Sequence, residues 1–465
     1  MYLNFYFIIL LIYIFNKSYI YALKFQTHKV PKTFNLTNKI GFNLRSLQDE
    51  NSKNKINLNF TNENLYYFNI EVGTPSQIFS ILIDTGSNYF WINSNSCISC
   101  KSARKFITDK SNTYNSSNKL ININYISGNL TGTISSDIVK FNNNINISNF
   151  NFILVNESDI NFELDGILGL SKNIKDFDNK ELSPLNQIYK QKIFDNNIFT
   201  LDFLNKNFFI GEYPSYLNLY NNITCKRKSI YNLNNFYWKC IAKKIKFSES
   251  LYYSNSNGHN IIFNSGLNSM VFSLNYMDFF KNVISNNKLL NKAKCQIKPS
   301  EENSLIYSLN CGDIINLINK EKSEYSKIYD EKFLSIYFDN DKNSIIEFKL
   351  KDLYDELNKN FKLYFIDILD NTIIVGIPLF EKYIVTLNQD TDEIIIYNNK
   401  RIIYNSWFNQ NILIKISIII IVICSILILI FFKFKIRKNK YNSIKLEKDF
   451  SKFILLTPEG THILK

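Results

Sequence analysis

Short runs of β-branched and aromatic residues recur between residues 65 and 398, separated by clusters of Asn, Ser, Gly and Asp. Runs of this kind, bounded by turn-forming residues, are typical of β-strands, and many of them at close spacing predict an all-β body. The clearest runs are LYYFNIEV, QIFSILID, KLININYI, TISSDIVKF, FNFILV, IFTLDFL, NFFIGEY, FYWKCIAKKIKF, NIIFNS and SLIYSL. Helical patterns are few, and we expect them at residues 182–192, 276–291 and 349–360.

An apolar segment near the beginning of the chain, residues 5–15, reads FYFIILLIYIF. It is too short to span a bilayer and has the length of the apolar region of a signal peptide. We therefore predict a signal peptide at residues 1–22, ending at the small residue Ala22. No Lys or Arg precedes the apolar run, which departs from the usual pattern, and an uncleaved signal anchor is the alternative.

A second apolar segment covers residues 412–432. At 1.5 Å per residue a helix of this length spans about 31 Å, the thickness of a hydrocarbon core. A basic cluster follows at once, in KFKIRKNK, and by the positive-inside rule this end is cytoplasmic. The segment predicts one C-terminal transmembrane helix of type I topology, with a cytoplasmic tail at residues 433–465. A buried core helix is the alternative.

The net charge of +13 is concentrated in terminal segments. Residues 23–60 hold seven basic and two acidic residues, residues 433–465 hold nine and three, and residues 61–410 are neutral overall. Nucleic-acid binding needs basic residues clustered on the folded domain, so no nucleic-acid partner is expected. Residues 23–60 show no sustained hydrophobic period and are interpreted as a pro-segment or linker.

Six of the seven cysteines lie in the body of the chain. An even number in an oxidising compartment indicates three disulfides, of which fifteen pairings are possible and neighbour pairing is the simplest. A zinc site is the alternative for the CxxC pair, but no second CxxC or His pair completes it, and the three histidines are scattered. We expect no metal and no cofactor. The six body cysteines are Cys97, Cys100, Cys225, Cys240, Cys295 and Cys311.

One sequence pattern occurs twice, about 180 residues apart. An apolar run leads to Asp84-Thr85-Gly86-Ser87 in the first half and to Asn264-Ser265-Gly266 in the second. Each half later has a second apolar run that ends in glycine: DGILGL at residues 165–170 and IIVG at residues 373–376. The body is therefore organised as two related halves.

These segments resemble the pepsin-like aspartic proteases over residues 65–398, with a layout closest to plasmepsins and membrane-anchored members. Residues 66–87 resemble the opening strand, the GTP turn and the first catalytic loop of that family. Residues 125–132 (YISGNLTG) resemble its flap, Tyr237-Trp238 the aromatic pair that opens the second lobe, and residues 374–397 the closing strands. The resemblance implies two β-lobes, at residues 61–235 and 236–400, with a cleft between them. Taken by itself, Trp238 is interpreted as a residue of the hydrophobic core.

In this family two carboxylates share one proton and hold a water, so that one acts as base and the other as acid. The resemblance assigns Asp84 to the first aspartate, Thr85 and Ser265 to the hydroxyls that lock the two loops, and Ser87 to the outer hydroxyl beside Asp84. It assigns Tyr125 to the flap tyrosine and Trp91 to its hydrogen-bond partner. The apolar subsite positions are Leu82, Ile167, Ile262 and Ile374. Pairing of Cys295 with Cys311 fits the family, whereas Cys225 and Cys240 do not match its small loop pair.

The second catalytic position departs from the family because it is Asn264, which is neither an acid nor a base near neutral pH. Leu267 stands where the family usually has Thr or Ser, so both the acid and its supporting hydroxyl are missing on the same side. Two hypotheses follow for a monomeric, membrane-anchored protein of the secretory pathway. The first is a homologue that binds polypeptide with impaired hydrolysis, and the second is an active aspartic endopeptidase. Deamidation of Asn264 would restore the second carboxylate.

Overall fold

The computed structural model describes residues 52–401 with short gaps, at 63, 126, 161–162, 173–179, 227–236, 249–250, 254, 301–303, 321–323, 340–343 and 357–358. It also describes helical residues 425 and 427–437, which belong to a separate unit that begins at Ile402. The predicted signal peptide and most of the predicted pro-segment, transmembrane helix and cytoplasmic tail lie outside the described residues. Among the described helices, none is both long and apolar enough to cross a membrane.

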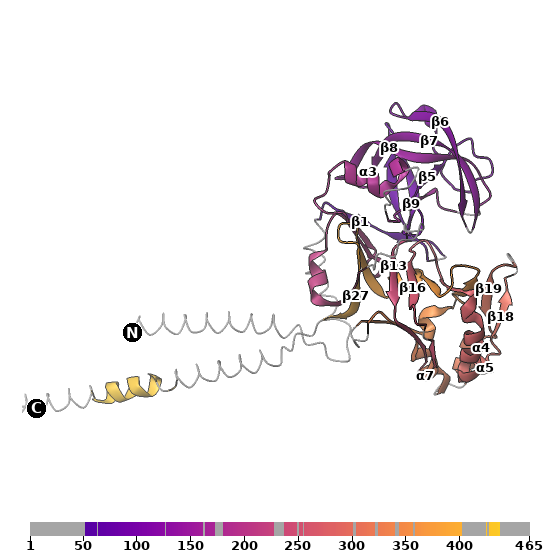
Figure 1. Cartoon of the computed structure of the whole chain (residues 1–465). Coiled ribbons are helices and arrows are strands. Elements are labelled where there is room, and N and C mark those ends of the chain that lie inside the picture. The colour runs from indigo at the N-terminus through magenta and orange to yellow at the C-terminus, as the bar shows by residue number, and fades with distance from the viewer. Residues whose placement is uncertain are drawn as a thin grey trace, which may run out of the picture. The chain divides into compact units, whose positions relative to one another are not determined.

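The first half of the chain forms an eight-stranded sheet that contains the first repeated motif (Figure 1). Strand β3 alternates buried with more exposed positions, as expected for a half-buried strand, and the last six residues of β4 are all buried. In sheet order the strands are β2 (Asn59–Phe60), β3 (Tyr66–Val72), β4 (Gln77–Asp84), β9 (Gly166–Gly169), β5 (Phe90–Asn93), β8 (Asn146–Ser158), β7 (Gly128–Lys140) and β6 (Asn115–Tyr125).

The second half forms a seven-stranded sheet and a four-stranded sheet. The seven-stranded sheet orders β13 (Lys239–Ala242), β16 (His259–Phe263), β25 (Thr372–Val375), β17 (Met270–Ser273), β24 (Leu363–Ile366), β19 (Tyr307–Asn310) and β18 (Gln296–Pro299). The four-stranded sheet orders β15 (Leu251–Tyr253), β14 (Lys244–Phe247), β20 (Lys332–Tyr337) and β21 (Ile345–Lys349).

A six-stranded sheet joins the two halves, because it pairs strands from the first half with the last two strands of the described body. Its order is β1 (Lys55–Asn57), β11 (Asn207–Ile210), β10 (Ile198–Asp202), β26 (Tyr383–Asn388), β27 (Glu393–Arg401) and β12 (Tyr220–Lys226). Between β10 and β26 the buried hydroxyls of Thr200 and Thr386 lie 2.8 Å apart. All ten predicted strand runs fall in these four sheets, so the predicted β-sheet body is confirmed in its main part; short helices between the strands make it mostly β rather than all β.

Two of the three predicted helical regions are confirmed with shorter bounds. The region 182–192 contains η2 (Lys180–Leu182) and α3 (Pro184–Lys190), and the region 276–291 contains η5 (Leu274–Tyr276), α4 (Met277–Asn286) and α5 (Lys288–Lys292). Asn287 separates α4 from α5, because its side chain accepts hydrogen bonds from the Leu289 and Leu290 N–H groups and caps the second helix.

The predicted helix at residues 349–360 is wrong. This region forms a short 3₁₀ turn, η6 (Leu350–Leu353), followed by the paired strands β22 (Tyr354–Asp355) and β23 (Asn360–Phe361). Leu350 and Leu353 have helical spacing and are both buried, but Tyr354 and Phe361 also turn inward and their rings meet at 5.0 Å. The aromatic pair favours the hairpin over continuation of the helix.

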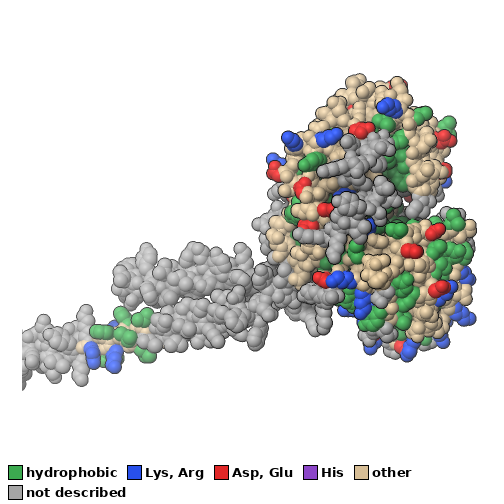
Figure 2. Space-filling model, in the orientation of Figure 1, with side chains coloured by type: hydrophobic (Ala, Val, Ile, Leu, Met, Phe, Trp, Pro, Cys, Tyr) green, Lys and Arg blue, Asp and Glu red, His purple; other side chains and the backbone are tan. Residues whose placement is uncertain are grey.

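Further short helices were not expected from the sequence: α6 (Ile314–Lys320), α7 (Glu324–Asp330), α8 (Ile377–Phe380), η1 (Thr108–Lys110), η3 (Phe203–Asn205) and η4 (Ser215–Leu219). The three disulfides join neighbouring cysteines: Cys97 with Cys100, Cys225 with Cys240, and Cys295 with Cys311. The simplest predicted pairing is therefore confirmed, and it is consistent with passage through the secretory pathway. Figure 2 shows acidic and basic side chains interspersed on the visible face of the described body.

Candidate active site

The two repeated motifs occupy equivalent places in the two halves. Strand β4 runs parallel to β9, which is antiparallel to β5, and β5 runs parallel to β8. In the second half, β16, β25, β17 and β24 repeat this arrangement. Asp84, the last residue of β4, lies beside Gly169 of β9. Asn264 directly follows β16, and its N–H donates to the Val375 carbonyl of β25 at 3.0 Å.

Thr85 and Ser265 lock the two loops together through four hydrogen bonds. The Thr85 hydroxyl donates to the Phe263 carbonyl at 2.8 Å and accepts from the Ser265 N–H at 2.9 Å. The Ser265 hydroxyl donates to the Ile83 carbonyl at 2.8 Å and accepts from the Thr85 N–H at 3.1 Å. Both hydroxyl residues are completely buried. The structure therefore brings together the two hydroxyls that the sequence had singled out.

The glycine of each loop packs against the polar side chain of the other loop. A Cβ atom added to Gly86 would lie 2.2 Å from Asn264 Nδ2, and one added to Gly266 would lie 2.5 Å from Asp84 Oδ1. Each glycine N–H also donates, at 2.8 Å, to Oδ1 of its own loop's Asp84 or Asn264. The side chains of Asp84 and Asn264 are thereby held in matching positions on the two loops.

Asp84 is a buried carboxyl group, with 7% of its surface exposed. Burial raises its pKa, and the Ser87 hydroxyl and the N–H groups of Gly86 and Gly266 oppose that rise. Asn264 is half-buried and carries no titratable proton. The pair therefore offers one ionisable carboxyl and one permanent amide, which can donate a hydrogen bond but cannot exchange a proton.

The two loops also differ three residues further on, at Ser87 and Leu267. Ser87 is buried, and hydrogen bonding by its hydroxyl opposes the rise in pKa of both Asp84 and Tyr125. The Leu267 side chain has no hydroxyl group, so it cannot form the corresponding hydrogen bond to Asn264. Its carbonyl accepts from the Ile377 N–H at 2.7 Å, so the backbone of the second loop is fixed while the polar support is absent.

Tyr125 lies at the end of β6, in the hairpin that β6 forms with β7. It pairs with Gly128, whose φ of +140° suits glycine at the turn. The Trp91 indole N–H donates to the Tyr125 hydroxyl at 3.1 Å, as the sequence predicts. Burial and the nearby Asp84 charge both raise the pKa of Tyr125, so its hydroxyl stays protonated and lies within electrostatic reach of the first loop. Its role as a flap residue stays a prediction.

The four predicted subsite residues form two neighbouring pairs. Leu82 lies beside Ile167 where β4 pairs with β9, and Ile262 lies beside Ile374 where β16 pairs with β25. Leu82 and Ile167 are 2% and 8% exposed and belong to the apolar cluster that also packs against Tyr125. Ile262 and Ile374 are half-buried and retain accessible surface. The assignment of all four to substrate binding stays a prediction.

Tyr237 was not expected at the site. Burial and the charge of Asp84 raise its pKa, so it lies near the first loop although it belongs to the second half. The neighbouring Trp238 is 1% exposed, and its indole N–H donates to the Leu170 carbonyl, just after β9, at 2.8 Å. In the sequence the aromatic pair itself is the one signal, and nothing in its spacing points to Asp84.

A sequence profile of the family described as "Eukaryotic aspartyl protease" matches residues 65–336. Bovine cathepsin D (Bos taurus) is 33% identical over 157 residues, which cover 30% of this chain and 40% of the relative. Chicken pepsin A (Gallus gallus) is 38% identical over 112 residues, 23% of this chain and 30% of the relative. Bovine chymosin is 36% identical over 111 residues, 23% of this chain and 29% of the relative.

The extent of the profile match and the repeated loop geometry place this chain in the eukaryotic aspartyl protease family, with a mostly-β, two-lobed, pepsin-like fold. The chain spans less than half the length of these curated relatives in the matched regions.

Proposed function

We propose that this protein binds polypeptide in a cleft between its two lobes and hydrolyses it poorly, because Asn264 replaces the second catalytic aspartate. The supporting observation is the pair of loops locked by Thr85 and Ser265, which hold the Asp84 carboxyl and the Asn264 amide in matching positions. The two loops are held in place, but the second carboxyl group and the hydroxyl that would support it are missing at Asn264 and Leu267.

The chemical reason for impaired hydrolysis is the loss of the shared proton. Two adjacent carboxylates have split pKa values because they cannot both ionise, and the split supplies a base and an acid at one pH. Beside Asn264, Asp84 can act as a base on water, but no second carboxyl stands ready to protonate the substrate carbonyl. The amide can only donate a hydrogen bond to it. The substitution should therefore reduce the rate of peptide hydrolysis more than it reduces the affinity for peptide.

The flap and the apolar pairs support a polypeptide ligand. Tyr125 is held by Trp91 at 3.1 Å, and Ile262 and Ile374 lie side by side on the two strands that frame Asn264. A cleft with this lining favours peptides with hydrophobic side chains flanking the central bond.

The terminal segments are the basis for a proposal on the cellular location and membrane topology of the protein. We infer that residues 1–22 direct the chain into the secretory pathway, that residues 23–60 form a pro-segment or linker, and that residues 412–432 anchor a monomeric body as a single-pass type I protein. The apolar runs and the basic cluster after residue 432 support this topology.

The test compares three forms of the full-length chain in detergent: wild type, Asn264→Asp and Asp84→Ala. Each is incubated with a mixed peptide library from acid to neutral pH, and products are read by mass spectrometry. The proposal is supported if wild type yields no cleavage products and the Asn264→Asp variant does. Cleavage by wild type that Asp84→Ala abolishes would instead establish the second hypothesis, an active endopeptidase.

A further inference from the structure

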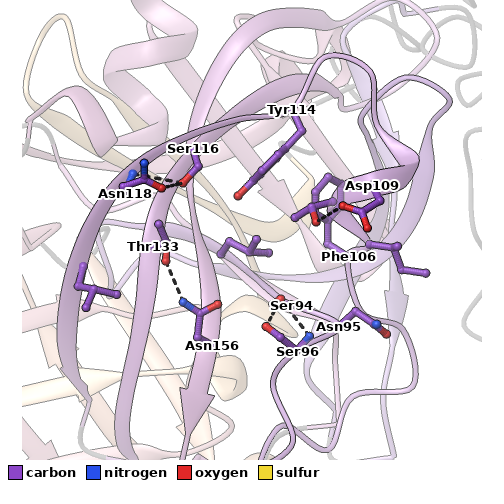
Figure 3. A pocket seen from close by; sticks show the side chains of 14 residues that line it. Ser94, Asn95, Ser96, Phe106, Asp109, Tyr114, Ser116, Asn118, Thr133 and Asn156 are labelled. Atoms are coloured by element: carbon purple, nitrogen blue, oxygen red, sulfur yellow. Dashed lines mark hydrogen bonds between the residues drawn. The ribbon is translucent and has the colours of Figure 1, made fainter.

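A cavity of about 580 Å³ lies in the first lobe, and its lining includes no residue of the paired loops of the candidate active site (Figure 3). Its volume falls within the range of small-molecule sites. Its walls come from the segment after β5, from the η1 region and from strands β6, β7 and β8. Ser94, Ser96, Phe106, Tyr114, Thr133 and Asn156 are among the fourteen lining residues.

The lining is rich in uncharged hydrogen-bonding groups. Asn156 Nδ2 donates to the Thr133 hydroxyl at 2.8 Å across β7 and β8, and the Ser94 and Ser96 hydroxyls lie 2.7 Å apart. Figure 3 shows these two pairs on the walls of the same cavity. Amides and hydroxyls both donate and accept, so the walls can match a ligand that carries several hydroxyl groups.

The charges of the lining restrict the ligand further. Asp109 is the one charged residue among the fourteen, and neither Lys nor Arg is among them. A phosphate or carboxylate ligand would meet this negative charge with no Lys or Arg among the lining residues to balance it. The ligand class is therefore neutral or weakly positive rather than anionic.

Apolar surface completes the lining. Tyr114 projects its ring into the cavity in Figure 3, its hydroxyl lies 3.0 Å from that of Ser135, and its ring packs at 5.7 Å from Phe106. Leu120 of β6, which is 71% exposed, also contributes to the wall. Sugars have both polar edges and apolar C–H faces, and such a mixed wall suits them.

From this combination we propose that the cavity is a binding site for a neutral sugar unit, such as a hexose or an N-acetylhexosamine. The site is distinct from the polypeptide cleft. The sugar can come from solution or from a glycan on the chain itself, because Asn156 begins the N-glycosylation sequence Asn156-Glu157-Ser158. A free sugar and a glycan attached to Asn156 would present the same hydroxyl groups and C–H faces to the cavity.

The first arm of the test uses the full-length chain produced without glycosylation. Saturation-transfer NMR measures binding of N-acetylglucosamine, glucose and mannose, with glucuronic acid and glucose 6-phosphate as anionic comparisons. The expected result is saturable binding of at least one neutral sugar and weaker binding of both anions. No saturable binding of any neutral sugar, or equal binding of the anions, would overturn the proposal.

Matched variants locate the binding. Ser96→Trp fills the cavity from an exposed position, and it should weaken the neutral sugar roughly tenfold or more, the factor for 1.4 kcal/mol. Ile98→Trp is the control, because Ile98 is 97% exposed, lies in the same segment and does not line the cavity. Equal affinity in Ser96→Trp and wild type, with both folded by circular dichroism, would place the sugar elsewhere and refute the site.

The second arm distinguishes the two sources. The glycosylated full-length chain is analysed by glycopeptide mass spectrometry beside Ser158→Ala, which removes the glycosylation sequence and keeps Asn156 in place. A glycan at Asn156 that blocks the free sugar, with binding restored in Ser158→Ala, identifies the chain's own glycan as the ligand. Binding of free sugar by both forms identifies the solution source. A glycan at Asn156 without any sugar binding by the unglycosylated chain contradicts the proposal.

Discussion

Restoring the second carboxyl by Asn264→Asp is the most informative perturbation of this site. The two side chains have nearly the same shape, and the Gly266 N–H that donates to Asn264 Oδ1 at 2.8 Å can donate equally to a carboxylate. The matching contact in the first loop, from the Gly86 N–H to Asp84 at 2.8 Å, shows that this loop geometry accepts an aspartate. We therefore expect the variant to fold with its loops unchanged.

The expected gain in rate follows from the chemistry that is restored. Loss of one member of a catalytic unit typically lowers kcat on the order of 10⁴-fold, which corresponds to about 5.5 kcal/mol of transition-state stabilisation. Asn264→Asp should recover much of this, with a bell-shaped pH profile because the two carboxyls share one proton. Leu267 limits the recovery, so Asn264→Asp combined with Leu267→Ser should exceed the single variant.

The assay measures kcat/KM on a fluorogenic peptide selected from the library, across acid and neutral pH, with the full-length chain. Asn310→Asp is the matched control, because it adds the same charge at an exposed position in β19. If Asn264→Asp and the double variant fold, bind peptide and still fail to cleave, then Asn264 does not limit hydrolysis and the reasoning is refuted.

Four further predictions follow from individual contacts. Thr85→Val removes two buried hydrogen bonds of the interlock and should lower the free energy of unfolding in urea by about 2–4 kcal/mol; a loss below about 0.5 kcal/mol would show that the lock is dispensable. His259 is fully buried and burial lowers its pKa to about 4, so its contribution to stability should be lost as pH falls from about 6.5 to about 4, and His259→Phe should flatten the dependence of Tm on pH over that window. Trp91→Phe removes the hydrogen bond to Tyr125 and should lower the affinity for peptide, measured by fluorescence anisotropy, roughly threefold to tenfold; unchanged affinity would show that this hydrogen bond does not contribute to peptide binding. Peptide mapping should recover Asn264 as Asn rather than Asp, because the following backbone N–H, which must attack the side chain during deamidation, is held in a hydrogen bond at 2.9 Å; a large Asp fraction in freshly purified protein would contradict this.

The strands and the two loops could be predicted because their signals are local. Apolar runs bounded by Asn, Ser and Gly become strands wherever one face is buried, and the Asp84 and Asn264 motifs each follow such a run. The neighbour pairing of the cysteines was likewise the simplest choice, and all three disulfides follow it. In these cases the feature depends on residues close together in the chain.

Features that depend on distant contacts could not be predicted. Leu350 and Leu353 have helical spacing, but the contact between Tyr354 and Phe361 turns the segment into a hairpin. Tyr237 lies near Asp84 although they belong to different halves of the chain, and the contact between these halves at Thr85 and Ser265 joins residues 180 positions apart. The cavity of the first lobe draws its wall from five separate segments, and the sequence of each segment alone is that of an ordinary strand or loop.

The central claim is that this cleft binds peptide without efficient turnover, and one measurement tests it most directly. A fluorescently labelled peptide is titrated with full-length wild-type protein, anisotropy follows binding, and mass spectrometry of the same samples follows the peptide over hours. We predict saturable binding with the peptide recovered intact. Rapid cleavage of the bound peptide by wild type, lost in Asp84→Ala, would contradict the account.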